Sequence, residues 1–182
     1  MLVKVEYLKV VDENNVPTGK REHRQIIHSK RLWHRTANIY FYRNLNNSVE
    51  ILVHLRLKTK DLNPNWRPYV WDTRLKAGET IEEATIGEIK DEIGLTVSFI
   101  DLIDYGWEKY DDGKNRGFNR VFLYQLKGNI NKLVFNDGEV QEVKWMKVDD
   151  IIKSVKEIPR KWVVKSKDLA RILNYFINNF KL

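Results

Sequence analysis

Alternating apolar and polar residues mark several strands in this chain. Residues 2–11 alternate and are rich in β-branched side chains, and residues 37–42 and 51–57 repeat the pattern on either side of the turn-forming stretch NLNNS. Such runs predict strands, and the pair around the short turn predicts a hairpin. We expect two more strands in TVSFIDLIDYGWEKY and GFNRVFLYQLKG, with a polar turn between their centres.

Two other segments have helical spacing. From Gly78 to Leu95, three isoleucines at positions 86, 89 and 93 fall within one narrow sector of a helix, which predicts an apolar stripe packed on a sheet. Residues 165–180 place Leu169, Ile172, Leu173, Phe176 and Phe180 at helical spacing after a candidate cap, Ser166. Strands alternating with helices around a mixed sheet predict an α/β (α+β) protein built as an α/β/α sandwich.

Length and composition limit the class of protein. With 182 residues and 42% hydrophobic content, the chain is long enough for one domain over residues 1–182. We divide it into a lead-in (1–35), a core (36–155) and a C-terminal helix (156–182), which is also compatible with a homodimer contact. The sequence shows no membrane span and no secretory leader, and the absence of Cys fits a reducing compartment, so we expect a cytoplasmic protein.

The formal net charge of +7 favours anionic partners. Dispersed Lys and Arg attract nucleic acid, but they attract small polyphosphates equally. The sequence contains no run of five consecutive basic residues and no recognition-helix or aromatic RNA-binding signature. Nucleic acid therefore stays open as a partner without a motif that indicates it, and a nucleotide or another small diphosphate is the simpler expectation.

An acidic cluster stands out against this basic background. Glu88, Asp91 and Glu92 are spaced i, i+3, i+4, on the side of the predicted helix nearly opposite its apolar stripe. Like charges at this spacing weaken an isolated helix. A divalent cation would reverse that penalty, because Mg²⁺ is held by carboxylates together with substrate phosphates. The alternative, a solvated acidic face, is common on amphipathic helices and stays open.

The spacing of these acids resembles the Nudix box, in which Gly and Glu precede Arg-Glu-apolar-x-Glu-Glu-x-Gly-apolar at fixed intervals. The matching residues are Glu79, Glu88, Ile89, Glu92, Gly94 and Leu95. Asp91 replaces the family's middle Glu, and Gly87 replaces the Arg that braces the carboxylates. WDTRLKAGE also looks like a trimmed version of the family's Gly-rich loop.

The segment VDENNVPTGKREHRQIIHSKRLWHRTANIYFY looks like the leader of a Nudix subgroup related to type I isopentenyl diphosphate isomerase. The resemblance extends over roughly residues 5–148. Isomerase activity is not expected, since that enzyme uses a catalytic Cys and this chain has none. We assign His23, His28 and His34 structural or substrate-contacting roles, because their spacing matches no compact metal motif.

The resemblance implies a Nudix-type fold and a pyrophosphohydrolase that uses Mg²⁺ or Mn²⁺ to act on a nucleoside diphosphate linked to another group. Glu88 and Glu92 would hold metal and help activate water, with Asp91 as a further ligand. Glu139, or failing that Glu142, would complete the catalytic set. The substrate-binding candidates are Arg56, Lys58, Arg35 and Arg74.

The departures at Gly87 and in the Gly loop predict weakened activity. They also motivate an alternative, in which a catalytically impaired Nudix fold binds a nucleotide or RNA end without cleaving it. A pure scaffold role has no specific support in the sequence.

Overall fold

The computed structural model describes residues 6–45, 48–56, 70–113, 115–135, 140–162, 171–172, 174–176 and 178–179. In chain order its elements are β1 (Tyr7–Val11), β2 (Pro17–His23), α1 (Arg24–Ser29), β3 (His34–Leu45), β4 (Ser48–Arg56), β5 (Trp71–Arg74), α2 (Ile81–Ile93), η1 (Phe99–Asp101), β6 (Ile103–Asp111), β7 (Arg116–Gln125), η2 (Ile130–Lys132), β8 (Val140–Lys147), α3 (Val148–Glu157) and η3 (Pro159–Lys161). No helix within this part of the chain is long and apolar enough to cross a membrane.

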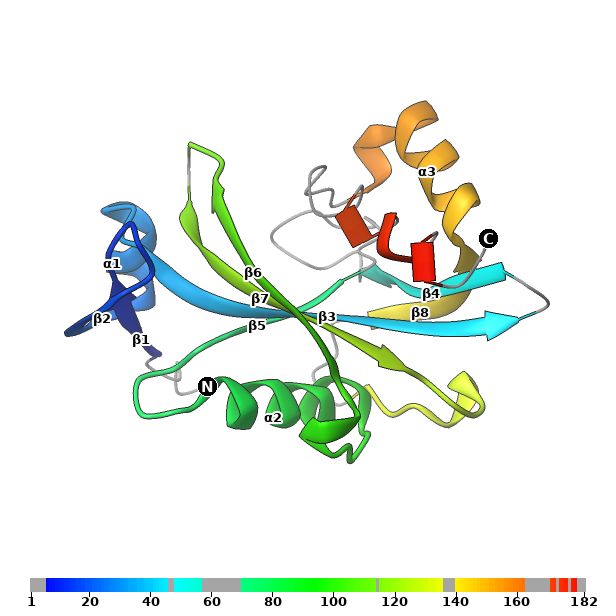
Figure 1. Ribbon diagram of the computed structural model, residues 1–182, viewed down its shortest axis with the longest axis horizontal. Helices are drawn as coiled ribbons and strands as arrows, with labels where there is room; N and C mark the ends of the chain where they lie inside the picture. The colour runs from blue at the N-terminus through cyan, green and yellow to red at the C-terminus, as the bar shows by residue number, and fades with distance from the viewer. Residues whose placement is uncertain are drawn as a thin grey trace.

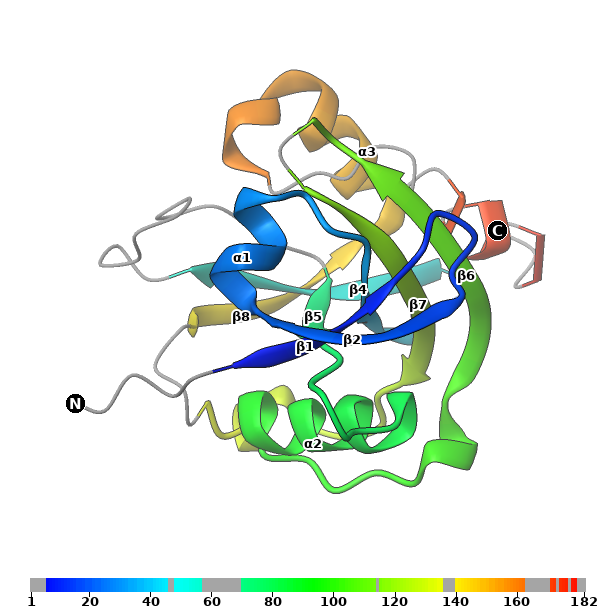
Figure 2. The ribbon, with the colours of Figure 1, turned by 90° about the vertical axis from the view of Figure 1, so that its left-hand side faces the viewer.

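The strands form one mixed sheet centred on β3. Strand β3 pairs in parallel with β7 and antiparallel with β1, β4 and β5, while β8 and β6 extend the sheet beside β4 and β7. The predicted hairpin is confirmed as β3 and β4, with Leu45 opposite Ser48. The β1–β2 ribbon and α1 lie at one end of this sheet in Figure 1 and face the viewer in Figure 2.

Helices cover both faces of the sheet, which confirms the predicted sandwich (Figure 1). Helix α2 covers one face, here called the α2 face, where Ala37, Ile39 and Phe41 of β3 join its core with Ile89 and Ile93. Helix α3 and the C-terminal residues cover the other, called the α3 face, where Tyr40 and Tyr42 alternate into a second core. Because side chains alternate along a strand, odd-numbered β3 residues serve the α2 face and even-numbered ones the α3 face.

The structure corrects several predicted boundaries. Strand β1 begins at Tyr7, and residues 1–5 lie outside the described part of the chain. The single strand predicted from residue 96 is wrong at its start, since η1 occupies Phe99–Asp101 and β6 begins only at Ile103. Alternation alone did not reveal that short helical turn. In the C-terminal helix, Ile172 and Phe176 are helical and fully buried, whereas residues 169, 173 and 180 are outside the described residues.

Candidate active site

Helix α2 is fixed at both ends by local sequence. Thr80 accepts a hydrogen bond from the Glu83 backbone N–H at 3.1 Å, and the Glu83 carboxylate accepts one from the Thr80 backbone N–H at 2.8 Å. This capping box satisfies two backbone donors at the helix start. At the other end Gly94 adopts φ 71°, a left-handed cap that suits glycine. The helix therefore runs from Ile81 to Ile93, inside the predicted stretch from Gly78 to Leu95, and it ends at Gly94 as predicted.

The acidic residues of α2 lie beside its apolar stripe, so the predicted opposite placement is wrong for two of them. The buried positions are Ala84, Thr85, Ile89 and Ile93, with Ile86 only half-buried. At about 100° per residue, Glu88 and Glu92 fall inside the arc that these residues span. Both line a narrow hollow, without room for a water molecule, together with Trp71, Ile39, Phe41, Ile89 and Ile93. These two carboxylates therefore face the sheet, as the apolar stripe does.

Glu88 is held by a strand residue that sequence reasoning missed. The Thr73 hydroxyl of β5 donates to Glu88 Oε2 at 3.0 Å. Burial raises the pKa of the Glu88 carboxyl above its ordinary value, hydrogen bonds with Thr73 and Glu92 lower it, and Asp72 raises it further. A polar residue two positions after a buried Trp was the available signal, since alternation around a Trp71 buried against α2 also points residue 73 toward α2.

The pair Glu88 and Glu92 suits a hard cation. Two ionised carboxylates do not hydrogen-bond to each other without a proton between them, and a divalent cation would replace that proton. Oxygen ligands are the ones that Mg²⁺ takes, usually one or two carboxylates completed by water and phosphate oxygens. Within the described residues no cluster of three or more His, Cys, Asp or Glu forms a ready-made metal site. These two side chains therefore fit a site that substrate and water would complete.

The other predicted metal and catalytic residues are placed differently. Asp91 is exposed and does not line the hollow. It falls just beyond the buried arc, on the Ala84 side. Glu139 lies outside the described residues, and Glu142 is exposed on β8, opposite Leu55 of β4. The structure thus brings together Glu88 and Glu92 and leaves Asp91 on the solvent side of the helix.

The predicted basic residues separate into different regions. Arg56 ends β4 half-buried, and alternation from Leu52, a member of the α2-face core, puts it on the α2 face. Arg35 donates from Nε to Asn15 Oδ1 at 2.7 Å and lies over the Trp107 ring at 5.2 Å, toward the β1–β2 turn. Arg74 alternates with Thr73 and so belongs to the α3 face. Lys58 lies outside the described residues. Among the described candidates, Arg56 and Arg35 therefore share the α2 face with Glu88 and Glu92, and Arg35 is bonded there to Asn15.

His54 is a second residue that the sequence did not single out. It is buried on β4, with its ring centroid 4.2 Å from that of Trp71 and its Nδ1 without a hydrogen-bond partner in the described structure. Burial, and then the charge of Arg56, lower the pKa of His54 to about 3. The imidazole is therefore neutral at physiological pH, beside the Trp that lines the acidic hollow.

A family model and two related proteins agree on the family of this chain. A model of the NUDIX domain matches residues 32–165. An uncharacterized Nudix hydrolase of Clostridium acetobutylicum is 26% identical over 150 residues, which cover 80% of this chain and 72% of that protein. The isopentenyl-diphosphate Delta-isomerase of Ruegeria pomeroyi is 24% identical over 155 residues, covering 84% and 81%. Both matches agree with the predicted superfamily.

Solved structures agree on the fold. A crystal structure of a Deinococcus radiodurans protein aligns with a TM-score of 0.67 at 19% identity, covering 93% of this chain and 98% of that one. An Ap4A hydrolase of Caenorhabditis elegans, solved as a binary complex, aligns with a TM-score of 0.55 at 20% identity, covering 79% and 97%. At these identities the likeness establishes the fold alone.

Proposed function

Because this chain belongs to the Nudix family, whose domain model matches residues 32–165, we propose that it is a divalent-metal-dependent hydrolase. Its substrate would be a nucleoside diphosphate linked to another group, cleaved within the diphosphate. The observation that carries the proposal is the pair Glu88 and Glu92, turned toward the sheet and lining one hollow with Trp71. A solvated acidic face would leave these two side chains exposed, whereas both are half-buried.

Glu88 and Glu92 would hold Mg²⁺ or Mn²⁺, with Asp91 reaching it as a further ligand or through water. When bound, the cation lowers the pKa of a coordinated water and offsets the charge that develops on the diphosphate. Thr73 fixes the Glu88 carboxylate by its hydrogen bond, and so supplies some of the bracing that an Arg at position 87 would give. Arg56, with Lys58 beyond the described end of β4, would bind the phosphate oxygens.

Glu139 is our proposed third acid, with Glu142 as the alternative. Its role is to accept the proton of the attacking water or to complete the metal site. Because Gly87 leaves the helix without the family's Arg, we propose weaker turnover than a complete motif would give. Positioning errors near 1 Å cost on the order of a hundredfold in rate, which sets the scale of this weakening.

The first test is hydrolysis by the purified chain. The protein would be incubated with Mg²⁺ or Mn²⁺ and a panel of linked nucleoside diphosphates, and the products separated by ion-exchange chromatography. We expect Glu92→Gln to lower kcat by about a hundredfold or more, because it removes a charged oxygen ligand. Glu82→Gln changes an exposed acid of the same helix and is the matched control, expected to retain activity.

The binding-module alternative predicts a different outcome. If the wild type releases no product from the panel but binds a nucleotide as tightly as Glu92→Gln does, the chain is a nucleotide-binding module. Calorimetry with a non-hydrolysable nucleotide analogue, with and without Mg²⁺, measures that nucleotide binding. Metal-dependent heat that disappears in Glu92→Gln supports the enzyme.

A further inference from the structure

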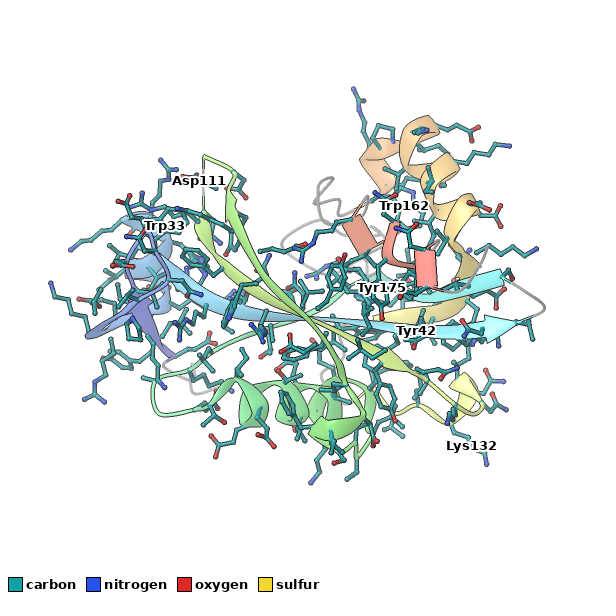
Figure 3. All side chains as sticks on the ribbon, viewed as in Figure 1. Trp33, Tyr42, Asp111, Lys132, Trp162 and Tyr175 are labelled. Atoms are coloured by element: carbon teal, nitrogen blue, oxygen red, sulfur yellow. The ribbon has the colours of Figure 1, made fainter. Side chains whose placement is uncertain are left out.

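Helix α1 packs at the start of β3, at one end of the α3 face. The ring centroid of its His28 lies 5.8 Å from that of His34, the first residue of β3. His34 is an even-numbered residue of β3, so its side chain points away from α2. Figure 3 shows Trp33, the residue before His34, at this end of the molecule and far from Tyr42. The region around His28 is therefore separate from the acidic hollow of the α2 face.

Arg74 of β5 belongs to the same region. It lies opposite Thr36 of β3, which follows His34 by two positions and points to the same face. Residues opposite one another on paired strands share a face, and a diagonal neighbour about 7–8 Å away is within reach of a long side chain. The Arg74 side chain therefore extends on the side of the sheet where His34 and His28 meet.

His34 is hydrogen-bonded on both sides of its ring. Its Nδ1 is 3.2 Å from the Leu32 carbonyl oxygen, and its Nε2 is 3.3 Å from the Tyr110 hydroxyl. A carbonyl oxygen only accepts, so Nδ1 carries the proton and Nε2 accepts the hydroxyl hydrogen. The His34 ring is therefore neutral and offers no ring nitrogen to a ligand.

His28 and Arg74 differ from His34 in this respect. The Nε2 atom of His28 is buried and has no hydrogen-bond partner in the described structure. The Arg74 guanidinium forms neither a hydrogen bond nor an ion pair with any residue of the described part of the chain, and this includes Asp72, two positions earlier on the same strand. A guanidinium presents its N–H donors in a planar fork that matches the oxygens of an anion. An unpaired fork next to an unpaired imidazole nitrogen indicates an anionic ligand.

The charge around His28 is positive. The pKa of His28 is lowered first by burial and then by the charges of Arg74 and Arg24, and the opposing effect of Glu6 is smaller. Arg24 is 3.4 Å from Glu6 and so is partly neutralised, whereas Arg74 has no acid within ion-pair distance among the described residues. Arg74 is therefore the main cation available to an anion at this place.

A ligand reaches this region from solvent without entering the core. His28, Arg74 and Arg24 are each only half-buried, so no enclosed cavity is needed. One acid shares the face, since burial, and then the charge of Asp72, raise the pKa of Tyr110. An anion is therefore expected on the His28 side of Arg74, away from Asp72.

We propose that Arg74 and His28 form a binding site for a phosphate group, separate from the acidic hollow. Arg74 binds two phosphate oxygens with its fork, and His28 Nε2 donates to a third, while Arg24 adds positive charge beside them. A carboxylate fits less well, because both of its oxygens are used by the Arg74 fork and none remains for His28. The proposal goes beyond the proposed function and does not depend on it, because no hydrolysis is involved.

The test is a titration of the full chain with inorganic phosphate at constant ionic strength and without added divalent metal. The ring nitrogens of the four histidines would be followed by ¹⁵N NMR and assigned with single His→Gln variants. We expect the His28 Nε2 signal to shift and saturate, and the His34 signals to stay in place because both of its nitrogens are bonded within the protein. Phenyl phosphate is the second probe. Saturation by both probes assigns the site to a phosphate group on a larger molecule, and saturation by inorganic phosphate alone assigns it to the free ion.

Arg74→Met keeps an unbranched side chain and removes the guanidinium, and we expect it to weaken phosphate binding by about tenfold or more. Lys132→Met is the matched control. It removes the same charge from an exposed residue that Figure 3 shows at the other end of the molecule, and binding should stay as in the wild type.

Arg74→Lys keeps the charge without the fork and should lose part of the affinity, which provides a second variant if Arg74→Met does not fold. A His28 signal that does not move, that moves without saturating, or that saturates equally in the wild type and both Arg74 variants would overturn the proposal.

Discussion

The two faces of β3 differ in whether their polar groups have hydrogen-bond partners. On the α2 face, Glu88 lies in an apolar setting but has the Thr73 hydroxyl and Glu92 beside it. On the α3 face, Asn38 lies deeper and has no partner in the described structure. A charge in a nonpolar environment needs neighbours even without ligand, whereas a neutral amide is tolerated unpaired at a smaller cost. The carboxylates of the α2 face are therefore held in place before any substrate binds.

The largest expected change on the α2 face is a loss of folding stability at low pH, caused by His54. Its pKa in the folded protein is about 3, below the ordinary value of 6.5, so the unfolded chain binds the proton more readily. Stability present above pH 6.5 is therefore lost as pH falls toward 3, with a slope of up to about 1.4 kcal/mol per pH unit. Urea unfolding of the wild type and His54→Leu at several pH values between 7 and 4 measures this slope. The variant should show a flatter dependence, and an identical slope in both proteins would contradict the assignment.

Thr73→Val tests the hydrogen bond that holds Glu88 on the α2 face. It keeps the β-branched shape and removes the donor to Glu88, so the pKa of that carboxyl should rise further and its position loosen. We expect about a tenfold loss of kcat near neutral pH, with the acid limb of the kcat/KM profile moved to higher pH.

Thr36→Val is the matched change on the other face. It leaves Asn119 Oδ1 without its hydroxyl donor, and should lower the free energy of unfolding by about 1–3 kcal/mol without moving the acid limb. Similar pH profiles for the two variants would mean that Thr73 has no special relation to Glu88.

Gly87→Ala gives the smallest expected change. An added Cβ at this helix-interior position meets no atom within 4 Å, and Ala is favoured over Gly there by about 1 kcal/mol. Thermal unfolding should therefore shift upward by about 2–4 °C, with kcat retained. Gly94→Ala is the contrasting control, because φ is +71° and the new Cβ would lie 3.0 Å from Val134 Cβ. If Gly94→Ala were also stabilised, backbone conformation and local space would not explain the effects of substituting these two glycines.

Much of the fold could be predicted because it depends on local patterns. Alternation identified β3 and β4, and the turn residues between them gave the hairpin. The Gly94 cap ended α2 near its predicted limit, since only a residue that accepts a positive φ ends a helix in that way. The acid spacing pointed to Glu88 and Glu92, although it placed them on the wrong side of the helix.

The rest of the candidate site depends on contacts between residues far apart in sequence. Thr73 reaches Glu88 across 15 positions, and the ring of His54 on β4 meets that of Trp71 on β5. Neither pair has a spacing that a periodicity analysis would detect. Asn38 belonged to a run that predicted only a strand, and its unsatisfied amide became visible once three other strands surrounded it.

The sequence by itself determined the β3–β4 hairpin, the C-terminal end of α2 and the family motif, because alternation, capping and spacing are properties of neighbouring residues. Only the tertiary structure decided that Glu88 and Glu92 turn inward while Asp91 stays in solvent, since the roll of a helix is set by what it packs against. It also decided which face of β3 would leave an amide unpaired. The physical reason is that burial arises from the assembled sheet, and burial is what makes a polar group costly enough to call for a partner.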